Sequence, residues 1–176
     1  KMLPYYNLSE KIGKIASQLT SSAIENVEIC CYGDANHSES IALIFLKGLL
    51  SSFTDNRVNM INANMVAKER GIKFSHSYNN EDISYLNLIK CTVKSTDEVI
   101  EISGSVFLEN HLRIVNIMGF DIDLDPVGTM LFIINKDVPG VVGKIGTLLG
   151  DLNINIGGYL LSKIEGNDFA YAVIKL

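Results

Sequence analysis

The residues whose types and spacing suggest binding chemistry lie at positions 135–141, which read NKDVPGV. Asp137 precedes a Pro-Gly step and an apolar, glycine-rich segment, and proline is favoured in the first turn of a helix. Free N–H groups at a helix start attract a carboxylate. The segment therefore predicts a site for a small amino acid. Asp137 would take the ammonium, and the carboxylate would lie on the backbone of Val138, Pro139, Gly140 and Val141. Asn135 stands at the same corner, where an amide could take a hydroxyl of the ligand. The alternative is that Asp137 only caps the helix.

The helix predicted over residues 139–152 carries glycines on one face. Gly143, Gly146 and Gly150 recur beside an apolar stripe that is expected to face the core and comprises Val141, Ile145, Leu148, Leu149 and Leu152. A face without side chains lets another backbone come close, so it predicts a helix–helix contact between two copies of the chain. Tight packing within one domain is the alternative. The glycine patterns of P-loops and dinucleotide sites do not occur in the sequence.

The elements that must position these residues follow a predicted domain boundary at residues 123–128. This segment reads DLDPVG, is acidic and shows no hydrophobic periodicity. Strands are predicted over 129–135, 153–163 and 169–176, with the glycine helix between the first two. The order β-α-β-β is that of a ferredoxin-like fold that lacks its second helix and last strand. We therefore expect two domains, at residues 1–126 and 127–176.

The first 126 residues predict a mixed α/β domain, so the fold class of the whole chain is α/β of the α+β kind. Apolar residues recur at helical spacing over 7–22, where Asn7 or Ser9 is a plausible cap. Further helices are predicted over 37–53 and 64–70. Strands are predicted over 26–34 and 72–78, a hairpin over 85–95 and 98–107, and a strand-rich segment over 111–124 with a turn or bulge at Gly119.

Composition excludes two classes of partner. The 176 residues are 47% hydrophobic and 20% charged, with a net charge of -5, whereas a protein that follows a phosphate backbone needs a basic excess. No nucleic-acid partner is therefore expected. The longest apolar run, at 41–50, is broken by Lys47 and is too short to span a bilayer, so no membrane is expected either.

No catalytic or metal site is expected in this sequence. The histidines, at 37, 76 and 111, lack ligand spacing to one another or to a cysteine. Ser40 lacks the context of a nucleophile elbow. The three cysteines, Cys30, Cys31 and Cys91, are odd in number and form no CxxC pair, which favours a reducing cytoplasm. Cys30 and Cys31 should point to opposite faces of their strand.

Several segments together resemble the C-terminal regulatory region of D-3-phosphoglycerate dehydrogenases. An ACT domain, a small regulatory ligand-binding module, is what residues 133–163 look like; they read IINKDVPGVVGKIGTLLGDLNINIGGYLLSK. LSEKIGKIASQL, VNMINANMVAKERGI, ISGSVF and RIVNIMGFDIDLDPVGTMLFI resemble the intervening domain of that family, also called the allosteric substrate-binding domain. The resemblance covers nearly the whole chain in the right order.

The resemblance implies a regulatory fragment that has no catalytic residues. L-serine is the implied effector, bound between two ACT copies with Asn155 supplied by the neighbouring copy. Arg113 and Lys175 are the implied cations of a site for phosphate or a phosphorylated acid between the domains, although each could be an independent, solvated side chain. The chain needs no cofactor of its own, and NAD is expected in a catalytic domain outside this sequence. A homo-oligomer is implied through the ACT domain.

The sequence departs from the family pattern at four places. Asn64 stands where the family has proline, so Asn64 should cap its helix. Asn135 replaces a histidine or tyrosine, the LENHL segment replaces a Gly-Arg turn, and Asp125 is acidic where some members are basic. Two other readings stay open. The chain could be the β-domain of an iron–sulfur L-serine dehydratase, which would need cluster cysteines, or a dimerisation module without a ligand.

Overall fold

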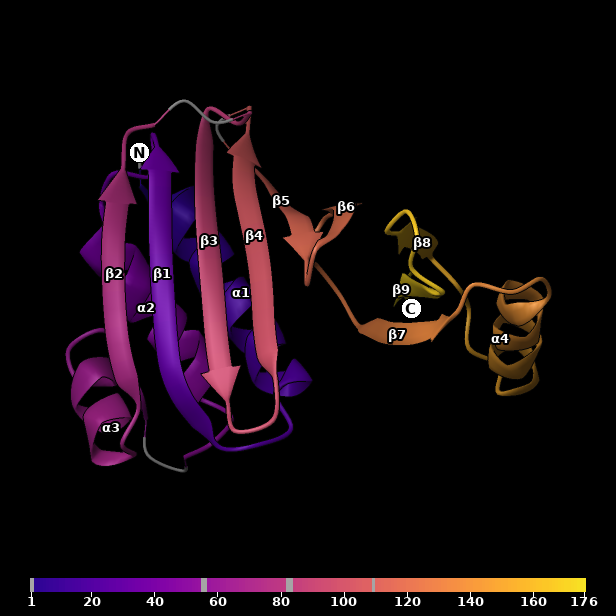
Figure 1. Ribbon diagram of the computed structural model, residues 1–176, viewed down its shortest axis with the longest axis horizontal. Coiled ribbons are helices and arrows are strands. Elements are labelled where there is room, and N and C mark those ends of the chain that lie inside the picture. The colour runs from indigo at the N-terminus through magenta and orange to yellow at the C-terminus, as the bar shows by residue number, and fades with distance from the viewer. Residues whose placement is uncertain (1, 55–56, 82–83, 109) are drawn as a thin grey trace.

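The computed structural model describes residues 2–54, 57–81, 84–108 and 110–176, and it contains two sheets (Figure 1). The larger sheet has the strand order β2-β1-β3-β4-β5-β6, in which β1 and β2 are parallel and all other neighbours are antiparallel. Its strands are β1 (Ile24–Gly33), β2 (Lys73–Asn79), β3 (Asn87–Ser95), β4 (Val99–Phe107), β5 (His111–Ile117) and β6 (Phe120–Leu124). Helices α1 (Leu3–Leu19), α2 (Ser38–Leu50) and α3 (Ala63–Glu69) lie on one face of this sheet.

The smaller sheet has the order β7-β9-β8 and is antiparallel throughout. Its strands are β7 (Met130–Lys136), β8 (Gly158–Lys163) and β9 (Phe169–Lys175), and α4 (Val141–Asp151) connects β7 to β8. Because β7 and β8 are both antiparallel to β9, they run parallel to each other with β9 between them. This is a split β-α-β unit. The predicted β-α-β-β order and the α+β fold class are confirmed.

The main core lies between the larger sheet and its helices. Alternate residues of β1, Val27, Ile29 and Cys31, are fully buried on the helix side. Leu8 of α1 and Phe45 of α2 are equally inaccessible. Each such side chain stabilises the fold by about 1.5–3 kcal/mol relative to an exposed one. Cys31 is buried and its neighbour Cys30 is only half-buried, so the two lie on opposite faces as the alternation predicted.

Helices α1 and α2 approach each other closely at two glycines. A Cβ atom added to Gly13 would lie 2.4 Å from the carbonyl oxygen of Phe45, and one added to Gly48 would lie 2.3 Å from the carbonyl oxygen of Glu10. Ser9 is buried at the same crossing, where its hydroxyl donates to the carbonyl of Ile41 at 2.7 Å. The prediction that Asn7 or Ser9 caps α1 is therefore wrong, because the helix begins at Leu3 with a proline in its first turn.

Helix α3 also begins differently from the prediction. It starts at Ala63, and the turn before it is held by Asn59 and Asn62 rather than by Asn64. The Oδ1 atom of Asn59 accepts the backbone N–H groups of Ile61 and Asn62, at 2.8 and 3.1 Å. The Oδ1 atom of Asn62 in turn accepts the N–H of Asn59 at 2.7 Å. These reciprocal bonds satisfy donors that would otherwise need a cap.

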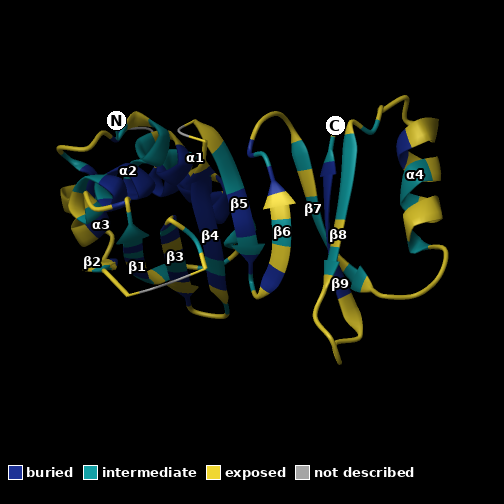
Figure 2. Cartoon of the chain, turned by 90° about the horizontal axis from the view of Figure 1, so that it is seen from above, coloured by how far each residue is buried: buried dark blue, intermediate teal, exposed yellow. Residues whose placement is uncertain are grey.

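Helix α4 buries fewer of its apolar side chains than the sequence predicted. It lies on the side of the smaller sheet that faces away from the larger one, and most of it is exposed (Figure 2). Leu149 is its one buried residue, at 5% exposure, in a helix that is described throughout. Leu148 and Leu152 are 59% and 60% exposed. The prediction that both face the core is wrong, because a three-stranded sheet contacts only part of the helix's apolar surface.

The crossing of α1 and α2 makes a stability prediction. Gly13→Ala should lower the free energy of unfolding by about 1–3 kcal/mol or more, because the added methyl meets backbone atoms of α2. Alanine's better helix propensity, worth about 1 kcal/mol, offsets only part of this loss. Urea unfolding measures both effects. Gly146→Ala is the matched control, since an added Cβ meets nothing within 4 Å there, and it should be neutral or stabilising. Equal stability of the two variants would contradict the close crossing.

Candidate functional site

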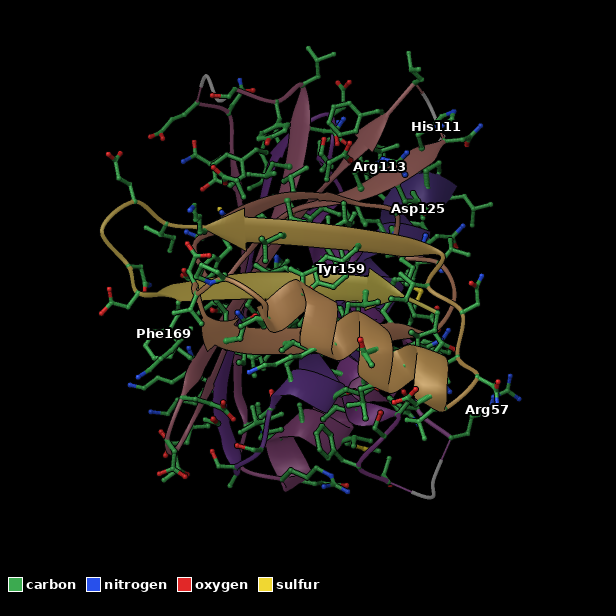
Figure 3. The ribbon with its side chains drawn as sticks, turned by 90° about the vertical axis from the view of Figure 1, so that its right-hand side faces the viewer. Arg57, His111, Arg113, Asp125, Tyr159 and Phe169 are labelled. Atoms are coloured by element: carbon green, nitrogen blue, oxygen red, sulfur yellow. The ribbon has the colours of Figure 1, made fainter. Side chains whose placement is uncertain are left out.

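Two cations predicted to hold an anion, Arg113 and Lys175, converge on one carboxylate between the sheets. The Nη1 atom of Arg113 lies 3.8 Å from Oδ1 of Asp125, and Nζ of Lys175 lies 3.9 Å from Oδ2 of the same residue. Lys175 also donates to the backbone carbonyl of Asp125 at 3.3 Å. Arg113 and Asp125 lie close to each other in the side-chain view (Figure 3). The structure therefore brings these two cations together, around a carboxylate of the chain itself.

The elements of the fold explain why these residues meet. Arg113 is on β5 of the larger sheet, and Lys175 is on the central strand of the smaller one. Asp125 belongs to residues 125–129, which connect β6 to β7. Sequence reasoning missed two further groups. Asp123 accepts from Nε of Arg113 at 3.0 Å, and Lys11 of α1 donates to the carbonyl of Pro126 at 2.9 Å. Only the folded chain brings α1, β5 and β9 to this connection.

Packing between the sheets fixes the position of β9. Tyr171 is 1% exposed and stacks on Phe120 of β6, with ring centroids 5.4 Å apart. It also makes a T-shaped contact with Phe132, with ring centroids 6.3 Å apart. Burial raises the pKa of Tyr171 to about 12. Its hydroxyl is buried without a hydrogen-bond partner among the residues that the structure describes. The ring, rather than the hydroxyl, therefore joins the two sheets.

The predicted amino-acid site lies on the opposite face of the smaller sheet. Asn135 of β7 and Lys163 of β8 both pair with Ala170 of β9, so they form one row across the sheet. Directly opposite residues of a sheet point to the same face, and successive residues of a strand point to opposite faces. Tyr171 points to the larger sheet, so its neighbour Ala170 and the whole row point to the other face, where α4 lies. The Oδ1 atom of Asn135 is buried and has no partner in the described part of the chain. Its Nδ2 donates to the carbonyl of Lys136 at 2.8 Å.

Asp137 already has a cationic partner, which the sequence analysis missed. The Nζ atom of Lys163 donates to Oδ2 of Asp137 at 2.9 Å. This hydrogen bond, followed by the charge of the carboxylate, raises the pKa of Lys163. Both side chains are exposed, so the pair contributes little stability. The two residues are 26 positions apart, and nothing in their local sequence indicates that they meet.

The helix start differs from the prediction in two respects. The N-cap of α4 is Gly140, at φ +90°, so Pro139 precedes the helix and Asp137 does not cap it. The N–H of Val138 donates to the carbonyl of Lys136 at 2.9 Å and is therefore engaged. A ligand carboxylate would have to compete with this bond, and the role of Val138 as a carboxylate donor stays a prediction. The helix begins at Val141, and the first N–H groups of a helix have no partner within it.

Of the remaining predicted residues, Asn155, Gly143 and Gly150 are exposed and Gly146 is half-buried. Strand β8 begins at Gly158, so Asn155 lies in the segment between α4 and β8 and not in a strand as predicted. A Cβ atom added to Gly143, Gly146 or Gly150 would meet nothing within 4 Å. The glycine face of α4 is therefore open in one copy of the chain. Its predicted contact with a second copy stays a prediction.

The other sequence predictions concern metals, disulfides and membranes. Among the described residues no group of three histidine, cysteine or acidic side chains could hold a metal ion. All three cysteines are free thiols, and burial raises the pKa of both Cys31 and Cys91. In the ranges described, no helix is long and apolar enough to cross a membrane.

The interface between the sheets makes a second prediction. Tyr171→Phe should leave the free energy of unfolding unchanged or raise it by up to about 1–3 kcal/mol, because it removes a buried, unpaired hydroxyl. Tyr171→Ala, the matched control, should cost about 3–5 kcal/mol by opening a cavity. Urea unfolding distinguishes the two. A clear loss of stability in the phenylalanine variant would mean that the hydroxyl has a partner after all.

Comparison with known proteins assigns the chain to a family. Residues 1–118 match the family described as the D-3-phosphoglycerate dehydrogenase intervening domain. The chain is 34% identical to a D-3-phosphoglycerate dehydrogenase of Archaeoglobus fulgidus over 92% of its own length and 31% of that protein. It is 35% identical to the one from Bacillus subtilis over 94% of its length and 32% of that protein. The chain thus spans about a third of the length of these curated relatives, and it belongs to the D-3-phosphoglycerate dehydrogenase intervening-domain family.

Proposed function

We propose that this chain is a regulatory part of a D-3-phosphoglycerate dehydrogenase that acts in serine synthesis in the cytoplasm. In this proposal it binds L-serine at the start of α4, between two copies of an ACT-like module. It also binds phosphate or a phosphorylated acid between its two sheets. The dehydrogenase reaction and its NAD belong to other parts of the parent enzyme. The observation that carries the serine proposal is the unpaired Oδ1 atom of Asn135, a residue in the same row of the sheet as Lys163, which pairs with Asp137.

The chemistry of serine suits this corner. An unpaired buried carbonyl oxygen costs about 1–3 kcal/mol, which a ligand hydroxyl or ammonium would recover by donating to Asn135. Asp137 would accept the ammonium by exchanging its bond to Lys163. The first N–H groups of α4, beginning at Val141, would receive the carboxylate. Asn155 of a second copy would complete the set.

A site completed by a second copy would couple the effector to assembly. The glycine face of α4 supports this arrangement, since Gly143, Gly146 and Gly150 present open backbone. A ligand that bridges two copies biases the geometry between them, and such coupling is typically about 1–3 kcal/mol. This is how a small molecule could influence an active site elsewhere in the parent enzyme.

The relatives favour this proposal over its rivals. The relatives from Archaeoglobus fulgidus, Synechocystis and Bacillus subtilis are all named as D-3-phosphoglycerate dehydrogenases, which disfavours the β-domain of an iron–sulfur serine dehydratase. A dimerisation module without a ligand would give no reason for the buried, unpaired Asn135 oxygen. Calorimetry with L-serine separates the effector site from such a module.

Titration of L-serine into the wild-type chain and two variants tests the effector site. Asp137→Asn and Asp137→Ala should each weaken binding about 10- to 100-fold, because a charge-assisted hydrogen bond contributes about 1.5–3 kcal/mol. Lys163→Met is the matched control. It removes the other half of the same ion pair and should bind serine at least as tightly as wild type. Serine affinity that is unchanged in Asp137→Asn would remove Asp137 from the site.

Sedimentation tests the contact between copies. Gly146→Leu should weaken self-association at least tenfold, because the side chain fills the open glycine face of α4. Thr147→Leu places the same side chain on an exposed neighbouring position of the helix and should leave association unchanged. A wild-type chain that stays monomeric at the highest concentration tested would refute an interface on this face.

A further inference from the structure

We infer that the carboxylate of Asp125 competes with anionic ligands for Arg113 and Lys175. Only a dianionic oxyanion therefore binds well between these two cations. The inference rests on the proposed anion site and adds to it the residue that selects the ligand. Without Asp125, two cations from different sheets would face an open position. With it, each oxygen of its carboxylate faces one of those cations, in the place where an anionic ligand would lie.

The distances show that this carboxylate is loosely held. Its two ion pairs measure 3.8 and 3.9 Å, beyond hydrogen-bond range. The firmer bonds of the same cations go elsewhere: Arg113 bonds to Asp123 at 3.0 Å, and Lys175 donates to the backbone carbonyl of Asp125 at 3.3 Å. A phosphate oxygen could make charge-assisted bonds of about 2.7–2.9 Å with the same groups. Displacement of the Asp125 carboxylate therefore breaks no short bond.

The balance of charge explains the selectivity. Arg113 and Lys175 supply two positive charges, and Asp123 and Asp125 supply two negative charges. A monoanion that displaced the Asp125 carboxylate would replace one negative charge by another, so it would gain little electrostatic energy. A phosphate group carries a charge of about -1.5 to -2 near pH 7 and has several strong acceptor oxygens, so it gains more than Asp125 gives up. Inorganic phosphate and phosphate monoesters are the ligand class that this geometry favours.

Partial burial makes the competition measurable. Arg113 and Lys175 have side chains that are 31% and 29% exposed, and Asp125 is 45% exposed, whereas Asp123 is 82% exposed. The charges near Asp125 are therefore screened less than those of a fully solvated pair. Lys11 holds the next residue of the connection through the Pro126 carbonyl. The backbone of the connection is thus anchored independently of the Asp125 carboxylate.

The experiment compares phosphate binding by the wild-type chain and Asp125→Asn, using calorimetry and thermal unfolding at constant ionic strength set with chloride. Asparagine keeps the shape and removes the charge, so phosphate should bind about 3- to 30-fold more tightly to the variant. Acetate should not stabilise the wild type, and it should stabilise Asp125→Asn only weakly, because a monoanion gains only where the charge of Asp125 is missing. Asp151→Asn, which removes an exposed carboxylate on α4, should bind phosphate like wild type. If Asp125→Asn fails to fold, Asp125→Ala makes the same test.

The outcomes separate the inference from the proposal beneath it. Equal phosphate affinity in wild type and Asp125→Asn would overturn the competitor role while leaving an anion site in place. No phosphate binding by either protein would overturn the proposed anion site itself. Addition of Arg113→Gln and Lys175→Gln to Asp125→Asn should abolish the gain in affinity. A gain that survives this triple substitution would place the phosphate elsewhere and overturn the inference.

Discussion

The burial of Tyr171 between Phe120 and Phe132 is the contact on which the arrangement of the two sheets depends. Its ring joins β9 to Phe120 of β6, and the same strand carries Lys175 to the connection that Arg113 approaches from β5. Aromatic contacts of this kind add about 0.5–1.5 kcal/mol each beyond the area they bury. The ion pairs at Asp125 are partly exposed and weaker. Apolar packing therefore sets the geometry, and the charged groups respond to it.

Both candidate binding sites already hold charges of the chain itself. Lys163 forms an ion pair with the carboxylate of Asp137, and Asp125 lies between Arg113 and Lys175. An incoming ligand must therefore displace a charged group of the chain rather than fill an empty site. Its affinity is the free energy of the new ion pair minus that of the ion pair it replaces. Such an exchange disfavours weakly charged competitors. It also leaves each site neutralised when no ligand is bound, which avoids the cost of uncompensated charges next to a packed interface.

The secondary structure could largely be predicted, because local patterns determine it. The helical spacing of Leu8 and Ile12 and the alternation in β1 and β3 follow from burial on one face. Caps were harder to predict. Ser9 was expected to cap α1, but it is buried against α2, where its hydroxyl satisfies the Ile41 carbonyl. The apolar stripe of α4 was visible, yet Leu148 and Leu152 are exposed. A stripe shows which side chains share a face, but it does not show how much surface the rest of the chain offers to cover it.

The sequence by itself determined the α+β order of elements, the glycine face of α4, and Asn135 and Asp137 as candidate binding groups, while the family resemblance pointed to Arg113 and Lys175. Only the tertiary structure decided which charges meet. Asp137 finds Lys163, and Arg113 and Lys175 find Asp125, because strand register and the packing of Tyr171 bring distant positions together. The physical reason is range. Periodicity and propensity act over a few residues, whereas an ion pair depends on separations of a few ångströms that the whole fold sets.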